Sequence, residues 1–377
     1  MIRKFITLFT DVTKTGTKIP KEEYLTTGKN IIIDQGKDSI AGYTDRQKGI
    51  FKEVPVIVFG DHTRIVKYVD KPFFLGADGV KVLKSKEKES NYKYLYYALK
   101  AAHIPNTGYN RHFKWLKQIN INYPGFNEQK NIVDILDSLT RIIKVRQKEL
   151  ALFDKLIKAR FVEMFGDPIS NNFNWNTTKL KNITSKITNG STPKGGSKNY
   201  VNSGVMFLRS QNIWRNHIDS SDVVFISEKT NLKLQKSVLK NNDILITKTG
   251  RINTQNSSLG RAALYSGKDN SANINGHVYL IRLKNHNLVL PRFLVTVLTG
   301  EAYRKYIRKV CVGGIDKRQI NLNQVENFPI ILPPVKKQQE FISLIQQVDK
   351  SKFENIVYLN KTLSSKILSQ IGDVIRD

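Results

Sequence analysis

The sequence runs twice through the same order of segments. Residues 116–124 lead into one long stretch with helical periodicity, and residues 325–333 lead into another. The two frames differ by 209 residues (116 against 325), and this offset sets Gln129 opposite Gln338. Self-similarity at a fixed offset predicts repeated structural units. We therefore expect a diverged duplication, in which each half is a globular unit followed by a long helix.

The globular units themselves contain further matches in the same order. The matched segments are Pro55–Gly60 with Asp243–Lys248, Gly76–Val80 with Asn273–His277, and Tyr94–Leu99 with Phe293–Leu298. Short β-branched runs predict strands, and two longer apolar stretches predict helices. The predicted strands are Asn30–Ile33, Val54–Phe59, Val205–Leu208, Asp243–Thr247 and Val278–Leu283, and the predicted helices are Tyr92–Ala102 and Pro291–Ile307.

The first long helix is predicted from about Glu128 to Phe165, where Gly166 and Pro168 supply a stop. Its apolar residues are spaced alternately by four and three, which is the seam of a coiled coil. Arg146 and Arg160 fill the two gaps in this seam. The seam residues are Ile132, Leu136, Leu139, Ile143, Leu150, Phe153, Ile157 and Met164.

The second long helix is predicted from about Lys336 to Ile375, with Lys352 interrupting its apolar series. Neither helix has enough apolar surface to be stable alone in water. Because a whole domain lies between them, we expect them to pack on each other in antiparallel orientation. The alternative is that each packs on its own domain. The second series is Ile345, Val348, Ile356, Leu359, Leu363, Ile367, Ile371 and Val374.

These segments predict an α+β fold with two similar mixed α/β domains and a pseudo-twofold internal repeat. Two long antiparallel helices, forming a coiled-coil spacer, are expected to separate the domains. The predicted limits are 1–125 for the first domain, 126–168 for the central helix, 169–334 for the second domain and 335–377 for the C-terminal helix.

The charge balance favours a polyanionic partner. Lysine and arginine outnumber acidic residues by 61 to 32, which gives a formal net charge of +29 and a pI near 9.9. A domain pI above about 9 is expected of a nucleic-acid binder. The single cysteine, Cys311, excludes an internal disulfide and a cysteine-based zinc site. No stretch approaches the roughly 18 to 20 apolar residues of a membrane span, so we predict a cytoplasmic protein without membrane contact.

A series of short sequence motifs follows in a fixed order from the end of the first long helix onward. The motifs are Phe161–Asp167, Trp175 with Lys179–Leu180, Ile187–Pro193, Ser203–Arg209, Asn242–Ile246, Leu259–Ala262, Gly313–Ile315 and Pro333–Pro334. In this order and spacing the chain resembles the specificity subunits of Type I restriction–modification systems over essentially its whole length. The first unit departs from the pattern, because no tryptophan opens it and Tyr123–Gly125 stands where the second unit has a double proline.

The resemblance implies a function and a set of partners. It implies two target-recognition domains, each reading half of a bipartite site in double-stranded DNA. It also implies that the paired helices set the spacing between the half-sites and dock methyltransferase subunits, which bring S-adenosylmethionine. A separate endonuclease and translocase subunit would join the assembly. The alternative function is a stand-alone DNA-binding scaffold or regulator, which would bind its site without such partners.

A catalytic role would require a motif of its own. An adenine-modifying methyltransferase needs an Asn/Asp-Pro-Pro-aromatic loop, whereas Pro333–Pro334 has the wrong neighbours. A metal-dependent nuclease needs an acidic residue ahead of an acid-x-Lys pair, and the set Glu128–Lys130 lacks one close before it. The sequence contains no phosphate-binding loop with the Gly-x4-Gly-Lys-Ser/Thr pattern. We therefore predict a non-catalytic chain that binds no metal or cofactor of its own.

DNA-reading residues are expected among polar and basic side chains on the long loops. Arginine pairs with guanine, and asparagine or glutamine pairs with adenine, each through two hydrogen bonds. The same residues could instead be solvated, or could contact phosphates, which position the duplex without specifying its sequence. Trp214 is expected first as a core residue and second as a stacking platform. The candidates are Lys14, Lys18, Arg46, His62, Arg64, Tyr109, Asn110, Arg111, Lys194, Arg209, Gln211, Asn212, Trp214, Arg215, Lys248, Arg251, Asn253, Gln255, Arg318 and Gln319.

Arg146 and Arg160 are candidates for partner binding. A buried charge in a helix seam is costly unless it is paired. These arginines therefore either face a partner subunit or DNA phosphates, or extend to the edge of the helix pair.

Overall fold

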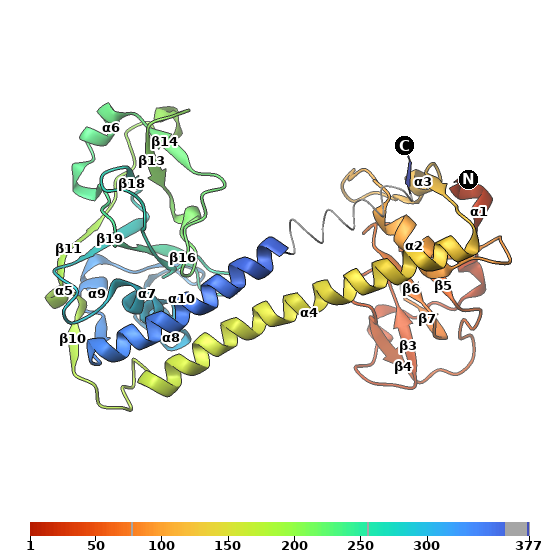
Figure 1. Ribbon diagram of the computed structural model, residues 1–377, viewed down its shortest axis with the longest axis horizontal. Coiled ribbons are helices and arrows are strands. Elements are labelled where there is room, and N and C mark those ends of the chain that lie inside the picture. Colours follow the sequence, from red (N-terminus) through yellow and green to blue (C-terminus); the bar gives the residue numbers. More distant parts are fainter. Residues whose placement is uncertain (77, 255, 359–374, 377) are drawn as a thin grey trace. The chain divides into compact units, whose positions relative to one another are not determined.

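A computed structural model describes residues 1–76, 78–254, 256–358 and 375–376 (Figure 1). The chain divides into two compact units. Unit 1 comprises Met1–Leu150 with Phe353–Asp377, and unit 2 comprises Ala151–Lys352. Two long helices, α4 (Phe126–Phe165) and α10 (Val335–Val357), contribute residues to both units.

The elements of unit 1 are β1 (Ile2–Lys4), α1 (Phe5–Leu8), β2 (Phe9–Asp11), η1 (Thr13–Thr15), η2 (Lys21–Glu23), β3 (Asn30–Ile33), β4 (Gly42–Thr44), β5 (Val56–Gly60), β6 (Val66–Val69), β7 (Phe73–Leu75), β8 (Val80–Ser85), α2 (Tyr92–Ala101), α3 (Phe113–Leu116), β9 (Asn120–Asn122) and β23 (Ile375–Arg376). The elements of unit 2 are β10 (Thr177–Lys179), α5 (Leu180–Ile183), β11 (Thr184–Asn189), η3 (Gly196–Asn199), β12 (Tyr200–Val201), β13 (Val205–Leu208), η4 (Ser210–Asn212), β14 (Val224–Ile226), α6 (Glu228–Leu232), η5 (Gln235–Ser237), β15 (Ile244–Thr247), β16 (Thr249–Arg251), β17 (Ala262–Leu264), β18 (Ala272–Ile274), β19 (Val278–Leu283), α7 (Pro291–Thr299), α8 (Glu301–Val310), β20 (Val312–Gly313), β21 (Lys317–Gln319), α9 (Leu322–Glu326), β22 (Pro329–Ile331) and α10 (Val335–Val357).

The central sheet of unit 2 has the strand order β11–β19–β15–β17 and is antiparallel throughout. Its side chains alternate between two cores, because successive residues of a strand point to opposite faces. On β15, Ile244 and Ile246 belong to the core shared with the helices, whereas Leu245 packs in the core beneath the smaller sheet that contains β13 and β18. This burial on both faces explains why β15 and β19 are nearly continuous apolar runs.

Unit 1 repeats the four-stranded central sheet of this architecture and the parallel pair of its smaller sheet, whereas the sheet β16–β21–β20 is described in unit 2 alone. Its central sheet has the order β2–β8–β5–β6, and its smaller sheet contains a parallel pair, β3 with β7. The corresponding pair in unit 2, β13 with β18, is also parallel. On β5, Ile57 and Phe59 again face the helix side, and Val56 and Val58 face the smaller sheet. The predicted duplication is therefore confirmed in the fold.

The predicted strands agree closely with the structure. Three of them, Asn30–Ile33, Val205–Leu208 and Val278–Leu283, match β3, β13 and β19 residue for residue. One alignment of the repeat was shifted: Val80 opens β8 and Val278 opens β19, so Val80 corresponds to Val278 and not to His277. The predicted helix Pro291–Ile307 is two helices, because Gly300 has an extended backbone between the end of α7 at Thr299 and the start of α8 at Glu301.

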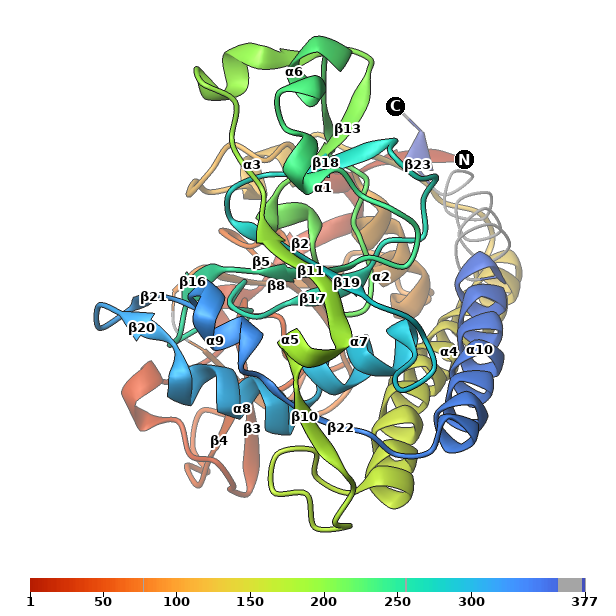
Figure 2. The same cartoon turned by 90° about the vertical axis from the view of Figure 1, so that its left-hand side faces the viewer.

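The long helices confirm antiparallel packing where they are described together within unit 2 (Figures 1 and 2). Lys352 of α10 pairs with Asp154 of α4 at 2.6 Å, and Phe341 of α10 stacks edge-on against Phe161 and Phe165 of α4. Residue numbers therefore rise along one helix as they fall along the other. Phe165 ends α4, and the next residue, Gly166, takes a positive φ of 70° that suits a helix stop.

The predicted seam was wrong near the C-terminal end of α4. Phe161 and Phe165 are buried there, whereas Arg160 is exposed and pairs with Glu163 at 2.5 Å. A straight helix has 3.6 residues per turn, so a strict heptad series drifts off the contact face. On α10, the predicted positions Leu359 to Val374 lie outside the described residues, and Ile375 belongs to strand β23 and not to a helix.

Gln129 and Gln338, matched by the 209-residue offset, perform the same task in both units. Both are buried near the start of a long helix. The side-chain oxygen of Gln338 accepts from the backbone N–H of Leu290, the residue before α7, at 2.9 Å, and its amide donates to the carbonyl of Pro333 at 2.8 Å. Gln129 likewise accepts from the N–H of Asn91 before α2 and donates to Pro124. Each glutamine therefore anchors a long helix to the helix of its domain.

Replacing Gln338 with leucine should lower the free energy of unfolding by about 2–3 kcal/mol, because buried backbone groups lose their partners. Denaturant unfolding of the full chain measures this change. Gln339→Leu is the matched control, since Gln339 is exposed one residue further along the same helix. Equal effects of the two substitutions would show that the buried amide is not an anchor.

Candidate nucleic-acid interface

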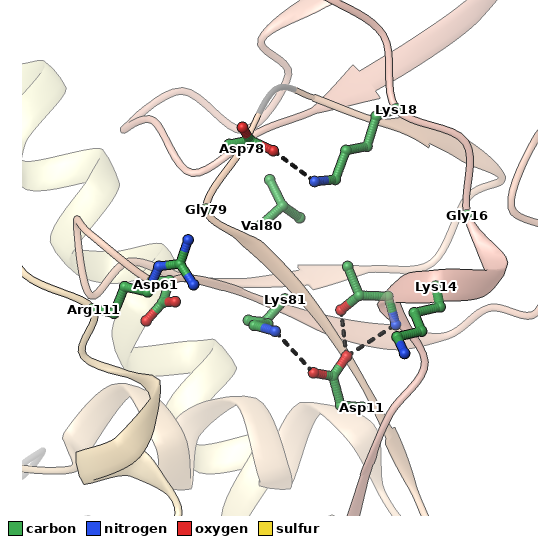
Figure 3. A pocket seen from close by; sticks show the side chains of 11 residues that line it. Asp11, Lys14, Gly16, Lys18, Asp61, Asp78, Gly79, Val80, Lys81 and Arg111 are labelled. Carbon is green, nitrogen blue, oxygen red and sulfur yellow. Dashed lines mark hydrogen bonds and ion pairs between the residues drawn. The ribbon is translucent and has the colours of Figure 1, made fainter.

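Unit 1 holds a cavity of about 490 Å³ at the ends of β2, β5 and β8 (Figure 3). Three predicted DNA-binding residues line it together: Lys14, Lys18 and Arg111. They come from distant parts of the sequence, and the sheet order β2–β8–β5 brings their loops to one place. The remaining lining residues are Asp11, Thr13, Gly16, Asp61, Asp78, Gly79, Val80 and Lys81.

The carboxylates of this cavity are all held by neighbouring donors. Lys18 pairs with Asp78 at 2.7 Å, and this hydrogen bond holds the pKa of Asp78 below its ordinary value. Burial alone would raise the pKa of Asp11, but hydrogen bonds from Thr13 and Lys81 outweigh it and lower the pKa. Asp61 is buried and accepts from the backbone N–H of Phe113 at 2.7 Å. Asp78 and Asp11 thus orient Lys18 and Lys81, and Asp61 holds the start of α3 at Phe113.

The other candidates of unit 1 lie on nearby or separate loops. Tyr109 is 89% exposed and stacks on His62, with ring centroids 4.8 Å apart. Arg64 donates to the carbonyl of Ile104 at 3.1 Å, so it supports the loop that carries Tyr109. Asn110 turns back to the carbonyl of Thr107. Arg46 is not part of the cavity lining and pairs with Glu23 at 2.6 Å.

Substituting Asp78 with asparagine should strengthen DNA binding several-fold at low salt. The change removes a negative charge from a basic cavity and frees Lys18 to contact the DNA. Titration of a labelled duplex at several salt concentrations measures both affinity and salt dependence. Asp45→Asn provides a control in unit 1 outside the cavity lining. An unchanged or weaker affinity for the Asp78 variant would place the DNA away from this cavity.

In unit 2, three candidates converge on Asp222. The carboxylate of Asp222 pairs with Arg209 at 3.1 Å and accepts from Gln211 at 2.7 Å and from Asn212 at 2.8 Å. Asn212 is fully buried. In this conformation its amide cannot reach a base and instead fixes the turn after β13. Arg209 and Gln211 lie on the same turn.

A second group forms around the small sheet β16–β21–β20 (Figure 2). Its register sets Gly250 opposite Arg318 and Thr249 opposite Gln319, so the predicted residues Arg251, Arg318 and Gln319 come together. Arg251 pairs with Asp316 at 3.3 Å and is largely exposed. Asn253 is exposed in the following loop, and Gln255 lies outside the described residues. Lys248 directly precedes β16, and its ammonium group lies 5.9 Å from the centre of the Tyr279 ring. The remaining candidate, Lys194, is exposed on the loop after β11.

The third group is an arginine cluster, defined as Arg215, Arg261, Arg304 and Arg308. The Arg261 guanidinium lies 3.9 Å from the centre of the Trp214 ring, and Trp214 is 36% exposed, so it is not the core residue that was expected first. Burial, and then the charges of Arg215 and Arg308, lower the pKa of Arg304. Within the described part of the chain, Arg261, Arg304 and Arg308 form no ion pair. Such concentrated positive charge attracts an anion.

Sequence reasoning found Trp214 and Arg215 but missed the rest of the arginine cluster. Arg304 and Arg308 are four residues apart on α8, so they share a helix face, and this spacing was the available signal. Arg261 gave no comparable signal. It donates to the carbonyls of Asn256 and Ser257, and so joins the Trp214 loop to the loop that carries Asn253.

The two partner-binding candidates both lie on the surface of α4. Arg146 pairs with Glu149 at 2.8 Å and lies over the Tyr358 ring at 5.7 Å. Arg160 pairs with Glu163. Each pair joins residues three positions apart on α4, so both arginine side chains lie along the helix surface and are partly exposed to solvent. Among the described residues no helix is long and apolar enough to cross a membrane, and no group of three or more His, Cys, Asp or Glu side chains could hold a metal ion.

The chain matches a family model described as "Type I restriction modification DNA specificity domain" over residues 7–152 and again over residues 172–364. It is 25% identical over 183 residues to a putative Type I restriction enzyme MjaX specificity subunit of Methanocaldococcus jannaschii, which covers 48% of this chain and 40% of that protein. It is 23% identical over 341 residues to the EcoR124I/EcoR124II specificity subunit of Escherichia coli, which covers 84% of this chain and 79% of that protein.

A solved structure shares the fold. The S subunit of a Type I restriction–modification system from M. genitalium superposes with a TM-score of 0.60 at 17% identity, covering 100% of this chain and 96% of that one. The match extends over both units, which agrees with the duplicated architecture.

Proposed function

The chain belongs to the Type I restriction modification DNA specificity family, and from that premise we propose that it is the sequence-reading subunit of a restriction–modification complex. It would read a two-part target in double-stranded DNA and carry out no catalysis itself. The observation that carries the proposal is the repeat of one domain, with each copy gathering predicted DNA-binding residues on loops at the end of its central sheet.

We infer that the basic residues contact two parts of the DNA, the phosphates and the grooves. We assign Arg304 and Arg308 of the arginine cluster to phosphate contacts, because they form no ion pair among the described residues, whereas Arg261 is buried and supports the cluster through its hydrogen bonds to Asn256 and Ser257. The cavity residues Lys14, Lys18 and Arg111, and the sheet residues Arg251 and Arg318, are assigned to the grooves. Arginine and lysine there can pair with guanine.

The helices and the partners complete the proposal. The recognition domains would occupy residues 1–125 and 169–334, and the helical segments 126–168 and 335–377 would set the distance between half-sites. Exposed faces of these helices, including Arg146 and Arg160, would dock methyltransferase subunits, which supply S-adenosylmethionine. An endonuclease and translocase subunit would then join this cytoplasmic assembly.

Methylation sequencing tests the proposal. A host carrying this chain with a neighbouring methyltransferase is compared with a host carrying the methyltransferase alone. We expect a new two-part motif with an unspecific gap, present only with this chain. Unchanged methylation, with tight binding of the isolated chain to a DNA site, would favour a stand-alone scaffold or regulator instead.

A further inference from the structure

Tyr109 and Ile315 are the two most exposed large apolar side chains among the described residues. Each is 89% exposed, and Met1 follows at 77%. A single exposed apolar residue needs no explanation, since folded proteins show many. The positions of Tyr109 and Ile315 do need an explanation, because one of the two residues lies in each unit.

The two residues occupy the same connection in the repeated fold. Tyr109 lies in the segment that leads into α3 and then β9, and Ile315 lies in the segment that leads into α9 and then β22. The strands β9 and β22 are equivalent, since each pairs with the first strand of its unit. In both connections an arginine follows closely, Arg111 in one and Arg318 in the other.

Basic residues outnumber acidic ones near each apolar side chain. Ile315 lies in the turn between β20 and β21, with Lys317 and Arg318 on the following strand and Arg251 on the neighbouring one, where Asp316 of the turn pairs with Arg251. Tyr109 stacks on His62, and Arg111, two residues further on, lines the basic cavity. An exposed apolar side chain with neighbouring arginine and lysine suits the major groove, where phosphates flank the base edges. That groove admits a two-stranded β-ribbon, and the thymine 5-methyl group is an apolar feature within it.

We propose that Tyr109 and Ile315 are specificity-determining residues that contact thymine methyl groups, Tyr109 in one half of the DNA target and Ile315 in the other. This inference rests on the proposed function. Neither residue carries a charge at neutral pH, so their contribution is to base discrimination and not to the salt-dependent attraction for DNA. The stack on His62 holds the Tyr109 ring in place, and the β20–β21 hairpin presents Ile315.

Deoxyuridine substitution tests the contact directly, because uracil lacks only the 5-methyl group. The full chain, assembled with its methyltransferase, is titrated with duplexes that carry the motif found by methylation sequencing. Each thymine of the motif is replaced by deoxyuridine in turn. We expect one position in each half-site to weaken binding about three- to tenfold, the size of one buried methyl contact. Ile315→Ser should abolish this sensitivity in one half-site, and Tyr109→Ser in the other.

Matched variants separate contact from indirect effects. Ile315→Val and Tyr109→Phe keep an apolar surface and should retain the sensitivity. Leu288→Ser removes an exposed apolar side chain elsewhere in unit 2 and should change nothing. Thermal unfolding should be the same for all variants, because the substituted side chains are exposed.

The failures are distinguishable. A wild-type assembly that binds no duplex specifically would defeat the proposed function. Specific binding with no thymine-sensitive position in either half-site would overturn the inference alone. So would serine variants that keep the wild-type sensitivity, that affect both half-sites equally, or that change only the salt dependence.

Discussion

Asp243→Ala is expected to lower the free energy of unfolding of unit 2 by about 3–5 kcal/mol, because it leaves a partly buried charge without its partner. Asp243 is 1% exposed and accepts two hydrogen bonds from Arg282, at 2.7 and 2.6 Å. The same carboxylate accepts from the backbone N–H of Lys240 at 2.6 Å. The ion pair joins the start of β15 to the end of β19, and its hydrogen bonds raise the pKa of Arg282. Urea unfolding of the full chain measures the loss.

A second variant shows whether the uncompensated charge is the cause. Adding Arg282→Met to Asp243→Ala should recover part of the lost stability, since replacing both members of a buried pair is far less costly than removing one. Asp349→Ala is the control, because Asp349 pairs with Arg292 at 2.8 Å but its side chain is 48% exposed. Its loss should stay within about 1 kcal/mol. A double variant less stable than Asp243→Ala would contradict this account.

The repeated fold could be predicted from the sequence because its signals are local. A strand buried on both faces is a nearly continuous apolar run, and Ile244–Ile246 of β15 and Val278–Ile281 of β19 each form such a run in the sequence. The equivalence of Gln129 and Gln338 also followed from one offset. The structure adds the reason for it, which is a pair of hydrogen bonds to backbone groups that the sequence does not display.

The residues that α4 buries and the break between α7 and α8 depend on tertiary packing, which the spacing of apolar residues in the sequence does not reveal. A series spaced by four and three fits two helices wound about each other. At the end of α4 the helix instead packs into the domain core, so Phe161 and Phe165 replace the predicted seam position Arg160. Likewise, the apolar run from Pro291 to Ile307 hides the break at Gly300, where α7 ends and α8 begins.

The candidate interface was predicted least well, because loop residues meet through tertiary contacts. Residue type alone gave Asn212 the same standing as Arg251, yet one is fully buried and the other exposed. The arginine cluster joins side chains from the Trp214 loop, from the start of β17 and from α8. No window of the sequence contains these segments together. Exposure likewise singles out Ile315, which sequence reasoning passed over as an apolar residue.

Replacing Arg304 and Arg308 together with glutamine is expected to weaken binding to any duplex about 100-fold at low salt, if each makes one charge-assisted phosphate contact. The dependence of log affinity on log salt should become shallower by about two, since roughly one counterion is released for each phosphate contact. The ratio of specific to unspecific affinity should stay the same, because phosphate contacts carry no sequence information. Titration of target and unrelated duplexes over a range of salt concentrations measures all three quantities.

Two further variants assign the effect to the arginine cluster and not to net charge. Arg304→Lys with Arg308→Lys keeps both charges, so the salt dependence should persist while affinity falls modestly with the loss of the planar guanidinium. Lys305→Gln removes a charge from the same helix, but Lys305 is paired with Glu301 at 3.1 Å and its side chain is 75% exposed. It should leave the salt dependence nearly unchanged. If Lys305→Gln matched half the effect of the double arginine variant, DNA would be responding to the overall charge of α8, and the specific geometry around Trp214 would have no part in holding the phosphate.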